Sequence, residues 1–301
     1  MSIFTGAGVA LITPMYEDGS INYAEMERII NDQIAQGTDA VIVCGTTGEA
    51  STLSYDEHRE TIRMCVSMVR KRVPVIAGTG SNCTKSAARL SREAQTVGAD
   101  ALLVVSPYYN KATQNGLIQH FTQIAGETDL PVILYNIQGR TGVNITPQTI
   151  ARLVRDVDQI VAVKEASGNL SQAAEIMQRT QGEVDLYSGN DDQIVPIVAL
   201  GGKGVISVLS HVAPGDTHDM VMKFMRGDLE GSRQLQLKYI PLIQALFSEV
   251  NPIPVKAAMN MMGYQAGPLR MPLTELEEPH RQMLYDAMVE AGIRLPAERP
   301  A

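Results

Sequence analysis

The sequence predicts a (β/α)8 barrel followed by a C-terminal helical segment. Eight short Val/Ile/Leu-rich runs recur along the chain, and helical patterns separate them. Near-continuous apolar runs are typical of strands covered on both faces, as in parallel sheets, and eight such strands alternating with helices indicate a barrel. The alternative is a doubly wound open sheet. That fold normally has a glycine-rich dinucleotide fingerprint after its first strand, and none follows the first run, 8–13.

The expected strands are short, and most end beside a glycine or a polar residue. In chain order they are 8–13, 40–45, 73–78, 101–106, 131–136, 160–165, 184–189 and 204–209. In such barrels the active site lies where the strands end at their C-terminal side. We therefore expect the residues at these strand ends to form the functional site.

Capping residues predict where the helices begin. Asn22 precedes a helical pattern that stops at Gly37, and Ser54 with Glu57 forms a capping-box pattern. The other expected starts are Thr84, Thr146 followed by Pro147, Asn169 or Ser171, and Asp191, whose helix contains Pro196 and is expected to kink early.

The strand signals stop at about residue 225, and three helical patterns follow. We therefore expect two domains, a catalytic barrel over 1–225 and a C-terminal helical domain over 226–301. The last eight residues, "RLPAERPA", are expected to form a frayed tail.

Composition excludes several classes of protein. The formal net charge is −8 without a long basic run, which argues against nucleic acid and anionic membranes as main partners. No apolar run is long enough for a membrane span, and the N-terminus lacks a basic region typical of a signal peptide. Three scattered cysteines fit a reducing cytoplasm. The histidines show no zinc-ligand spacing, so we expect no metal, and we expect His211 and His218 to lie at the surface.

The stretch "IVAVKEASG" at 160–168 ends an apolar run on Lys164. Lysine is almost never fully buried without a partner, so one reading is a strand-end lysine that reaches water. The other is a lysine inside the barrel mouth, where desolvation lowers its pKa. Lowering that pKa to about 7–8 costs roughly 4 kcal/mol, which a functional site can justify. A neutral amine attacks carbonyls and forms a Schiff base.

Other strand-end residues supply what such an amine needs. Tyr135 can exchange protons if another hydroxyl, on Thr46 or Tyr109, relays them, although it also reads as an ordinary strand tyrosine. Thr47 lies in a glycine turn that can direct N–H groups at an anion, or that is simply a turn. Arg140 suits a carboxylate, although most loop arginines are only solvated.

Six ordered motifs and one C-terminal motif carry a resemblance to a known family. They are "GTTGE" (45–49), "SPYYNK" (106–111), "YNIQGRTG" (135–142), "KEASGN" (164–169), "SGNDD" (188–192), "GGKGVISV" (201–208) and "NPIPVKAAM" (251–259). The chain resembles the pyruvate-dependent class I aldolase family that contains the dihydrodipicolinate synthases and N-acetylneuraminate lyase. The resemblance extends over nearly the whole chain.

The resemblance implies a mechanism and residue roles. Pyruvate forms an imine and then an enamine on Lys164 without any other cofactor, and the enamine attacks L-aspartate 4-semialdehyde in the diaminopimelate route to lysine. Tyr135 is the implied acid/base, relayed through Thr46 to Tyr109, which in the family reaches into a partner subunit of a tetramer built from two tight dimers. The implied binding residues are Thr47 for the pyruvate carboxylate, Arg140 for the semialdehyde carboxylate, and Gly189 and Ile206 for the pyruvate pocket.

The "GRT" at 139–141 favours the synthases over the sugar-acid lyases, which lack it and usually have Ser-Thr where this chain has Thr46-Thr47. Two alternatives stay open. The first is a pyruvate lyase that acts on a sugar acid or another aldehyde, and the second is a noncatalytic barrel that serves as a binding protein.

The chain departs from the family pattern at three positions. Gln138 stands where the family usually has proline, which frees the loop that carries Arg140. Asn190 replaces the more usual aspartate. His58, Asn82 and Tyr108 match positions used by lysine-inhibited members, but Ser86 stands where those members have a glutamate that pairs the effector's ammonium group. We therefore expect activity, with weak or absent inhibition by lysine.

Overall fold

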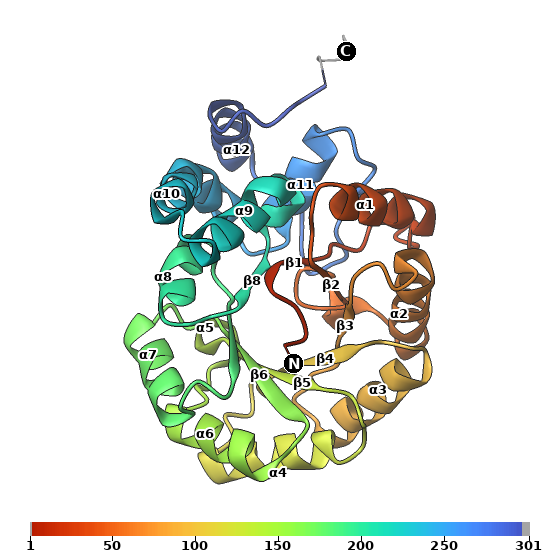
Figure 1. The fold of residues 1–301 in the computed structure, drawn as a ribbon. Coiled ribbons are helices and arrows are strands. Elements are labelled where there is room, and N and C mark those ends of the chain that lie inside the picture. The colour runs from red at the N-terminus through yellow and green to blue at the C-terminus, as the bar shows by residue number, and fades with distance from the viewer. Residues whose placement is uncertain (1, 297–301) are drawn as a thin grey trace.

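Eight parallel strands close into a barrel in which each strand pairs with the next, and the last pairs with the first. In the computed structural model, which describes residues 2–296, helices surround this barrel (Figure 1). The strands are β1 (Gly6–Ala10), β2 (Ala40–Val43), β3 (Val75–Gly78), β4 (Ala101–Val105), β5 (Val132–Asn136), β6 (Ile160–Glu165), β7 (Asp185–Ser188) and β8 (Gly204–Ser207). The predicted (β/α)8 barrel is confirmed, and the open-sheet alternative is wrong.

The helices fill the intervals between strands and then continue beyond the barrel. They are α1 (Tyr23–Ala35), α2 (Tyr55–Val69), α3 (Thr84–Thr96), α4 (Gln114–Ala125), α5 (Gln138–Thr141), α6 (Pro147–Asp156), α7 (Leu170–Arg179), α8 (Ile194–Ala199), α9 (Pro214–Met225), α10 (Leu229–Leu246), α11 (Ile253–Met261) and α12 (Glu278–Glu290). Within residues 2–296, no helix has the length and apolar character needed to cross a membrane.

Most of the capping predictions are confirmed. Asn22 and Asn169 accept hydrogen bonds from the first turns of α1 and α7, and Ser54 forms a complete capping box with Glu57 at the start of α2. Thr146 caps α6 in the same way, with Pro147 at the first helical position. The helix α3 begins at Thr84 as expected, but Thr84 is not its cap, because the N-cap position is Cys83 and the Thr84 hydroxyl instead lies 2.8 Å from Nδ1 of His120.

The helix expected to begin at Asp191 is divided. A 3-10 turn covers Asp191–Gln193, and α8 begins only at Ile194. Pro196 therefore lies in the first turn of α8, where the N–H that proline lacks would have no intrahelical partner. The predicted helix start is wrong because the Asp191 carboxylate does not cap this helix. It accepts hydrogen bonds from the amides of Val208 and Leu209, the two residues that follow β8.

Apolar side chains form two layers around the strands. The outer layer lies between strands and helices and includes Val41, Leu134 and Val163, whereas the inner layer fills the barrel and includes Ile42, Ile133 and Ala162. Successive residues of each strand thus alternate between the two layers, as the pleat requires. This alternation decides which strand-end residues face the barrel interior.

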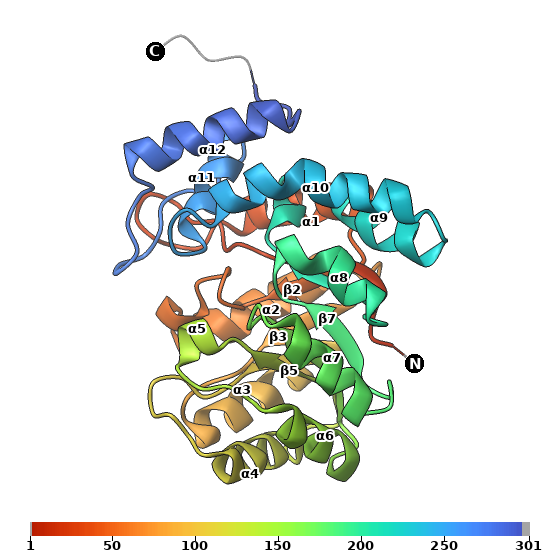
Figure 2. The ribbon, with the colours of Figure 1, turned by 90° about the vertical axis from the view of Figure 1, so that its left-hand side faces the viewer.

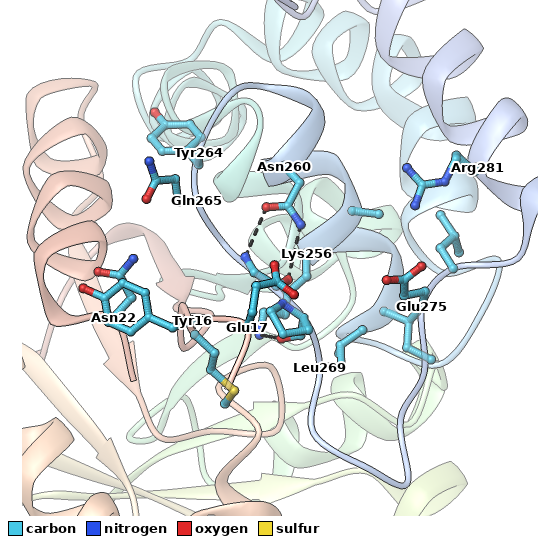
Figure 3. Close-up of a pocket in the computed structure, with 16 residues that line it drawn as sticks. Tyr16, Glu17, Asn22, Lys256, Asn260, Tyr264, Gln265, Leu269, Glu275 and Arg281 are labelled. Carbon is cyan, nitrogen blue, oxygen red and sulfur yellow. Dashed lines mark hydrogen bonds between the residues drawn. The ribbon is translucent and has the colours of Figure 1, made fainter. Parts of the chain in front are cut away.

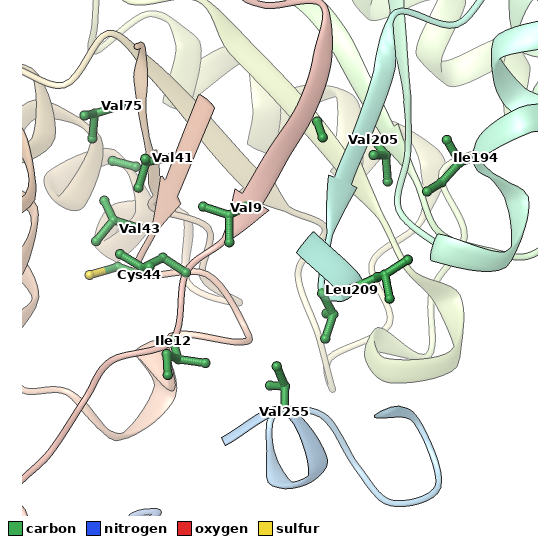
Figure 4. Close-up of a cluster of buried hydrophobic side chains, with 14 of the residues drawn as sticks. Val9, Ile12, Val41, Val43, Cys44, Val75, Ile194, Val205, Leu209 and Val255 are labelled. Carbon is green, nitrogen blue, oxygen red and sulfur yellow. The ribbon is translucent and has the colours of Figure 1, made fainter. Parts of the chain in front are cut away.

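The C-terminal helices α10, α11 and α12 lie together on one side of the barrel, beside α9 (Figure 2). Val255 of α11 belongs to the outer apolar cluster and lies near Ile12 and Leu209, at the ends of β1 and β8 (Figure 4). The C-terminal segment therefore shares the barrel's apolar core. The division at residue 225 stays a prediction, and the part of the expected frayed tail at 297–301 lies outside the described residues.

Candidate active site

Lys164 points into the barrel. Its neighbours two positions away on either side, Ala162 and Ala166, both belong to the inner apolar layer. Since alternate residues of a strand share a face, Lys164 lies on the same face. The side chain is buried, with the residue 6% exposed, so the reading of Lys164 as a strand-end lysine in water is not supported.

Among residues 2–296, Lys164 forms no hydrogen bond or salt bridge, and the charges that act on its amine are those of Asp191 and Arg140. Its Nζ lies 4.3 Å from the ring centroid of Tyr135, which is paired with Lys164 across β5 and β6. Burial lowers the pKa of Lys164, the Asp191 charge opposes this shift and the Arg140 charge adds to it, with a resulting pKa of about 8. This shift corresponds to about 3 kcal/mol in favour of the neutral amine.

Tyr135 is the closest acid/base candidate. Burial raises the pKa of its phenol to about 12, while the Arg140 charge and a hydrogen bond with the Thr46 side chain act in the opposite direction. Tyr135 therefore keeps its proton near neutral pH and can donate it to a reacting group beside Lys164. The structure thus brings together Lys164, Tyr135 and Thr46, as the sequence predicts.

Tyr109 does not join this group within one chain. It is 88% exposed, and its backbone has φ 74°, in the loop that follows β4. A non-glycine residue in this left-handed region is uncommon and needs support from its surroundings. Its amide donates to the carbonyl of Thr141, which ties the Tyr109 loop to α5.

Thr47 is held in the glycine turn that joins β2 to α2. The Thr13 hydroxyl donates to the carbonyl of Gly48 at 2.7 Å, which fixes this turn to the end of β1. Thr47 is buried, and its hydroxyl oxygen accepts a hydrogen bond from Nδ2 of Asn251 at 2.9 Å. A residue of the C-terminal segment therefore reaches the predicted anion-binding turn.

Arg140 lies in the short helix α5, at the exposed rim. Its Nη2 donates to the backbone carbonyl of Asn251 at 2.9 Å. Arg140 lines a cavity of about 660 Å³ together with Thr46 and Tyr135. Gln138, at the first position of α5, is exposed and lies outside this lining.

Gly189 directly follows β7, and Ile206 lies on β8. A Cβ at Gly189 would lie 2.4 Å from Cβ of Ala166, so only glycine fits beside the residue two positions after Lys164. Ile206 is 1% exposed and belongs to the inner apolar layer with Tyr135. Both positions are therefore close-packed parts of the barrel interior.

Sequence reasoning missed Asp191 as a site residue. Its Oδ2 accepts from the amides of Val208 and Leu209 at 3.0 and 2.8 Å, and its buried Oδ1 has no partner among residues 2–296. Burial raises the pKa of Asp191, and its negative charge favours the protonated form of Lys164. The only sequence signal was its place in "SGNDD", which we interpreted as a helix start.

Glu165, the residue after Lys164, has a structural role. Its carboxylate accepts from the amide of Ser167 at 2.7 Å and from the side chains of Asn136 and Gln172 at 3.0 and 3.1 Å. These contacts hold the turn after β6 against α7. They leave Lys164 as the only charged residue of β6 that faces the barrel interior.

The expectation of two surface histidines is wrong for His211. His211 is 2% exposed, and its Nε2 accepts from the amide of Ile12 while Nδ1 lies 3.0 Å from the carbonyl of Val208. Burial lowers its pKa to about 4, so it is a neutral structural histidine. His218 is partly exposed and bonds the carboxylate of Asp39.

A second buried lysine lies on the other side of the glycine turn. Lys256 of α11 is 1% exposed, and its Nζ contacts Glu49 Oε1 at 2.8 Å and the carbonyl of Pro268 at 2.6 Å. It lines a hollow of about 500 Å³ between the N-terminal segment and the C-terminal helices (Figure 3). This ion pair links the C-terminal segment to the turn that carries Thr47.

Comparison with known proteins places the chain among enzymes. The profile of the dihydrodipicolinate synthetase family matches residues 3–291. The curated 4-hydroxy-tetrahydrodipicolinate synthase of Lachnoclostridium phytofermentans is 59% identical over 97% of this chain and 100% of its own length. The enzyme of the same name from Caldicellulosiruptor bescii is 53% identical over 97% of this chain and 99% of its own length.

Solved structures agree with these matches. The structure of a chloride-inhibited dihydrodipicolinate synthase from Acinetobacter baumannii in complex with pyruvate superposes with a TM-score of 0.94 at 40% identity. The match covers 96% of this chain and 99% of that one.

Proposed function

The chain belongs to the dihydrodipicolinate synthetase family, and from this premise we propose that it catalyses the 4-hydroxy-tetrahydrodipicolinate synthase reaction. In that reaction pyruvate condenses with L-aspartate 4-semialdehyde, on the diaminopimelate route to lysine. The protein is accordingly a lyase of the class I aldolase type. The observation that carries the proposal is the buried, unpaired Lys164, whose amine is nucleophilic because burial lowers its pKa to about 8.

The chemistry begins at Lys164. Its neutral amine attacks the keto carbon of pyruvate, and loss of water leaves a protonated imine. Loss of a proton from the methyl carbon gives an enamine, which attacks the aldehyde carbon of the semialdehyde and forms the new carbon–carbon bond. Attack by the product's own amino group on the imine carbon then displaces Lys164, regenerates the free amine and closes the ring.

Tyr135 supplies and accepts protons during these steps. Its phenol stays protonated near neutral pH and lies beside the Lys164 amine, so it can protonate the departing oxygen of pyruvate. Thr46 relays that proton. We propose that Tyr109 from a partner subunit completes the relay, since its own side chain is exposed in the single chain.

The two carboxylates are bound at different depths. We propose that Thr47 binds the carboxylate of pyruvate through its amide and hydroxyl, in a pocket closed by Gly189 and Ile206. Arg140 binds the carboxylate of the semialdehyde at the rim, where its guanidinium has donors left after its single bond to Asn251. Gln138 and Asn190 do not line the cavity that Arg140, Thr46 and Tyr135 share, so we expect them to leave the reaction intact.

Several wider properties belong to the same proposal. No cofactor is needed, because the imine itself activates pyruvate. The protein acts in the cytoplasm as a homotetramer built from two dimers, and pyruvate and the semialdehyde are its small-molecule partners. The buried, unpaired Cys44 and Cys65 fit a reducing compartment.

Inhibition by lysine is proposed to be weak. Ser86 lacks a carboxylate, and its hydroxyl accepts a hydrogen bond from Tyr55 at 3.1 Å, so it offers no negative charge to an incoming ammonium group. Strong inhibition of the purified enzyme by lysine below about 1 mM, an affinity of roughly −4 kcal/mol, would contradict this.

Acceptor specificity tests the proposal. The purified protein is incubated with pyruvate and either L-aspartate 4-semialdehyde or a sugar-derived aldehyde, and pyruvate consumption is measured. The reverse cleavage of a 2-keto-3-deoxy sugar acid is measured in parallel. We expect turnover with the semialdehyde alone. Cleavage of the sugar acid without turnover of the semialdehyde would instead identify a sugar-acid lyase.

A further inference from the structure

Asn251 contacts both proposed substrate-binding donors from outside the barrel. It lies between α10 and α11 and is 6% exposed. Its side-chain Nδ2 donates to the Thr47 hydroxyl at 2.9 Å, while its backbone carbonyl accepts from Arg140 Nη2 at 2.9 Å. The side chain and the backbone of one residue therefore reach two different parts of the site.

The side-chain contact decides what the Thr47 hydroxyl can do. A hydroxyl group has one proton and two acceptor lone pairs. Because the Asn251 amide donates to the Thr47 oxygen, it occupies a lone pair and leaves the hydroxyl proton available for another acceptor. A carboxylate in the pyruvate pocket is the acceptor that this proton would meet.

The Asn251 amide is poorly satisfied apart from this contact. Its Oδ1 is buried and has no hydrogen-bond partner among residues 2–296. A buried acceptor left without a partner costs folding free energy, so an apolar side chain would serve a purely structural position better. The burial of an amide here therefore indicates a role in the site.

We propose that Asn251 is a positioning residue that directs the hydroxyl proton of Thr47 toward the carboxylate of pyruvate. This inference rests on the proposed function, because it requires pyruvate at Lys164. It also assigns the C-terminal segment a part in the site, because Asn251 lies beyond the barrel and fixes the direction in which the Thr47 hydroxyl donates its proton. Substitution of Asn251 should change the binding of pyruvate and not that of the semialdehyde. The contact with Arg140 is made by the backbone carbonyl of residue 251, so it survives a change of side chain.

The test compares Asn251→Ala and Asn251→Asp with wild type. A carboxylate at 251 can only accept, so in Asn251→Asp the Thr47 hydroxyl donates to residue 251 and is lost to pyruvate. The amount of reduced adduct at Lys164 is measured against pyruvate concentration with borohydride. We expect half-saturation to rise about tenfold in Asn251→Ala and further in Asn251→Asp, while KM for the semialdehyde changes less than about threefold.

Two further measurements separate positioning from general damage. Acetone carries a methyl group in place of the carboxylate, so its trapping at Lys164 should be unchanged in both variants. In a double-mutant cycle, Asn251→Ala should add less than about a twofold effect once Thr47→Val is present, because the two residues act through one contact. Asn260→Asp, on the outer part of α11, is the matched control and should leave trapping as in wild type.

The outcomes are distinguishable. Equal losses for pyruvate and acetone, or full additivity with Thr47→Val, would overturn the inference and leave the proposed function standing. If a folded Asn251→Asp protein reaches half-saturation at the same pyruvate concentration as wild type, the inference is likewise overturned and the proposed function stands. If wild-type protein forms no pyruvate adduct at Lys164, the proposed function fails, and the inference fails with it.

Discussion

The two buried lysines of this protein have opposite surroundings. Lys256 is 1% exposed and is paired with Glu49 at 2.8 Å and with the carbonyl of Pro268. Lys164 is 6% exposed, its Nζ lies 4.3 Å from the centroid of the Tyr135 ring, and among residues 2–296 it forms no hydrogen bond or salt bridge. Burial lowers the pKa of both amines, but at Lys256 the charge and hydrogen bond of Glu49 oppose the shift.

The difference separates a structural lysine from a reactive one. A buried ion pair whose remaining hydrogen bonds are satisfied keeps its lysine charged, and a charged amine is not a nucleophile. An unpaired buried lysine escapes the cost of burial by losing its proton. The same residue type is therefore a link between segments at 256 and the proposed nucleophile at 164.

Substitution of Lys164 should have the largest effect on activity. We expect Lys164→Ala to lower kcat by at least about a thousandfold, because no other group can form the imine. Lys223→Met, on the exposed side of α9, is the control and should keep wild-type kcat. Substantial turnover by a folded Lys164→Ala protein would contradict the assignment of the nucleophile.

Substitution of Lys256 should instead act on stability. Lys256→Met leaves Glu49 buried without its cation, which we expect to lower the free energy of unfolding by about 3–5 kcal/mol. Glu49→Gln in the same chain removes the unpaired charge and should recover part of this loss. Urea unfolding of the three proteins measures both changes, and a neutral effect of Lys256→Met would show that the pair contributes nothing.

Lys164 should destabilise the fold that contains it. In the folded protein its pKa is about 8, below its unfolded value, so the unfolded state binds more protons between these two values. The contribution of Lys164 to the free energy of unfolding therefore rises with pH between these two pKa values. Below about pH 8 the buried charge lowers the free energy of unfolding by about 3 kcal/mol. We expect Lys164→Met to be more stable than wild type by about 1–3 kcal/mol at pH 7, and the gain to shrink toward pH 10. Equal stability at both pH values would argue that Lys164 is not desolvated.

The rate of imine formation should follow the protonation of Lys164. Only the neutral amine attacks, so below its pKa of about 8 the rate should rise about tenfold per pH unit and then level off. Stopped-flow measurements with pyruvate under single-turnover conditions give this profile. A rate that is independent of pH between 6 and 8 would contradict the lowered pKa.

The strands and the site residues at their ends were predicted well. The apolar runs located all eight strands because strands covered on both faces need such runs, and Lys164, Tyr135 and Thr46 followed from their places at strand ends. The partners of Thr47 and Glu49 were not predictable, since Asn251 and Lys256 lie more than 200 positions away. Periodicity carries no information on such contacts. Asp191 was missed because an aspartate before an apolar run is also a common helix cap.

Tyr109 marks another limit. The sequence placed it at a strand end together with Tyr135, but the single chain leaves it exposed. The partner that we propose for it belongs to another subunit, and the sequence around Tyr109 gives no sign of such a contact. The resemblance to the family, rather than spacing or composition, suggested its role.

Borohydride reduction in the presence of pyruvate, followed by peptide mapping, tests the contrast between the two lysines most directly. The account predicts one reduced pyruvate adduct per chain, on the peptide that contains Lys164, with Lys256 unmodified. An adduct on Lys256 or on any other lysine, or an unchanged protein mass, would contradict it.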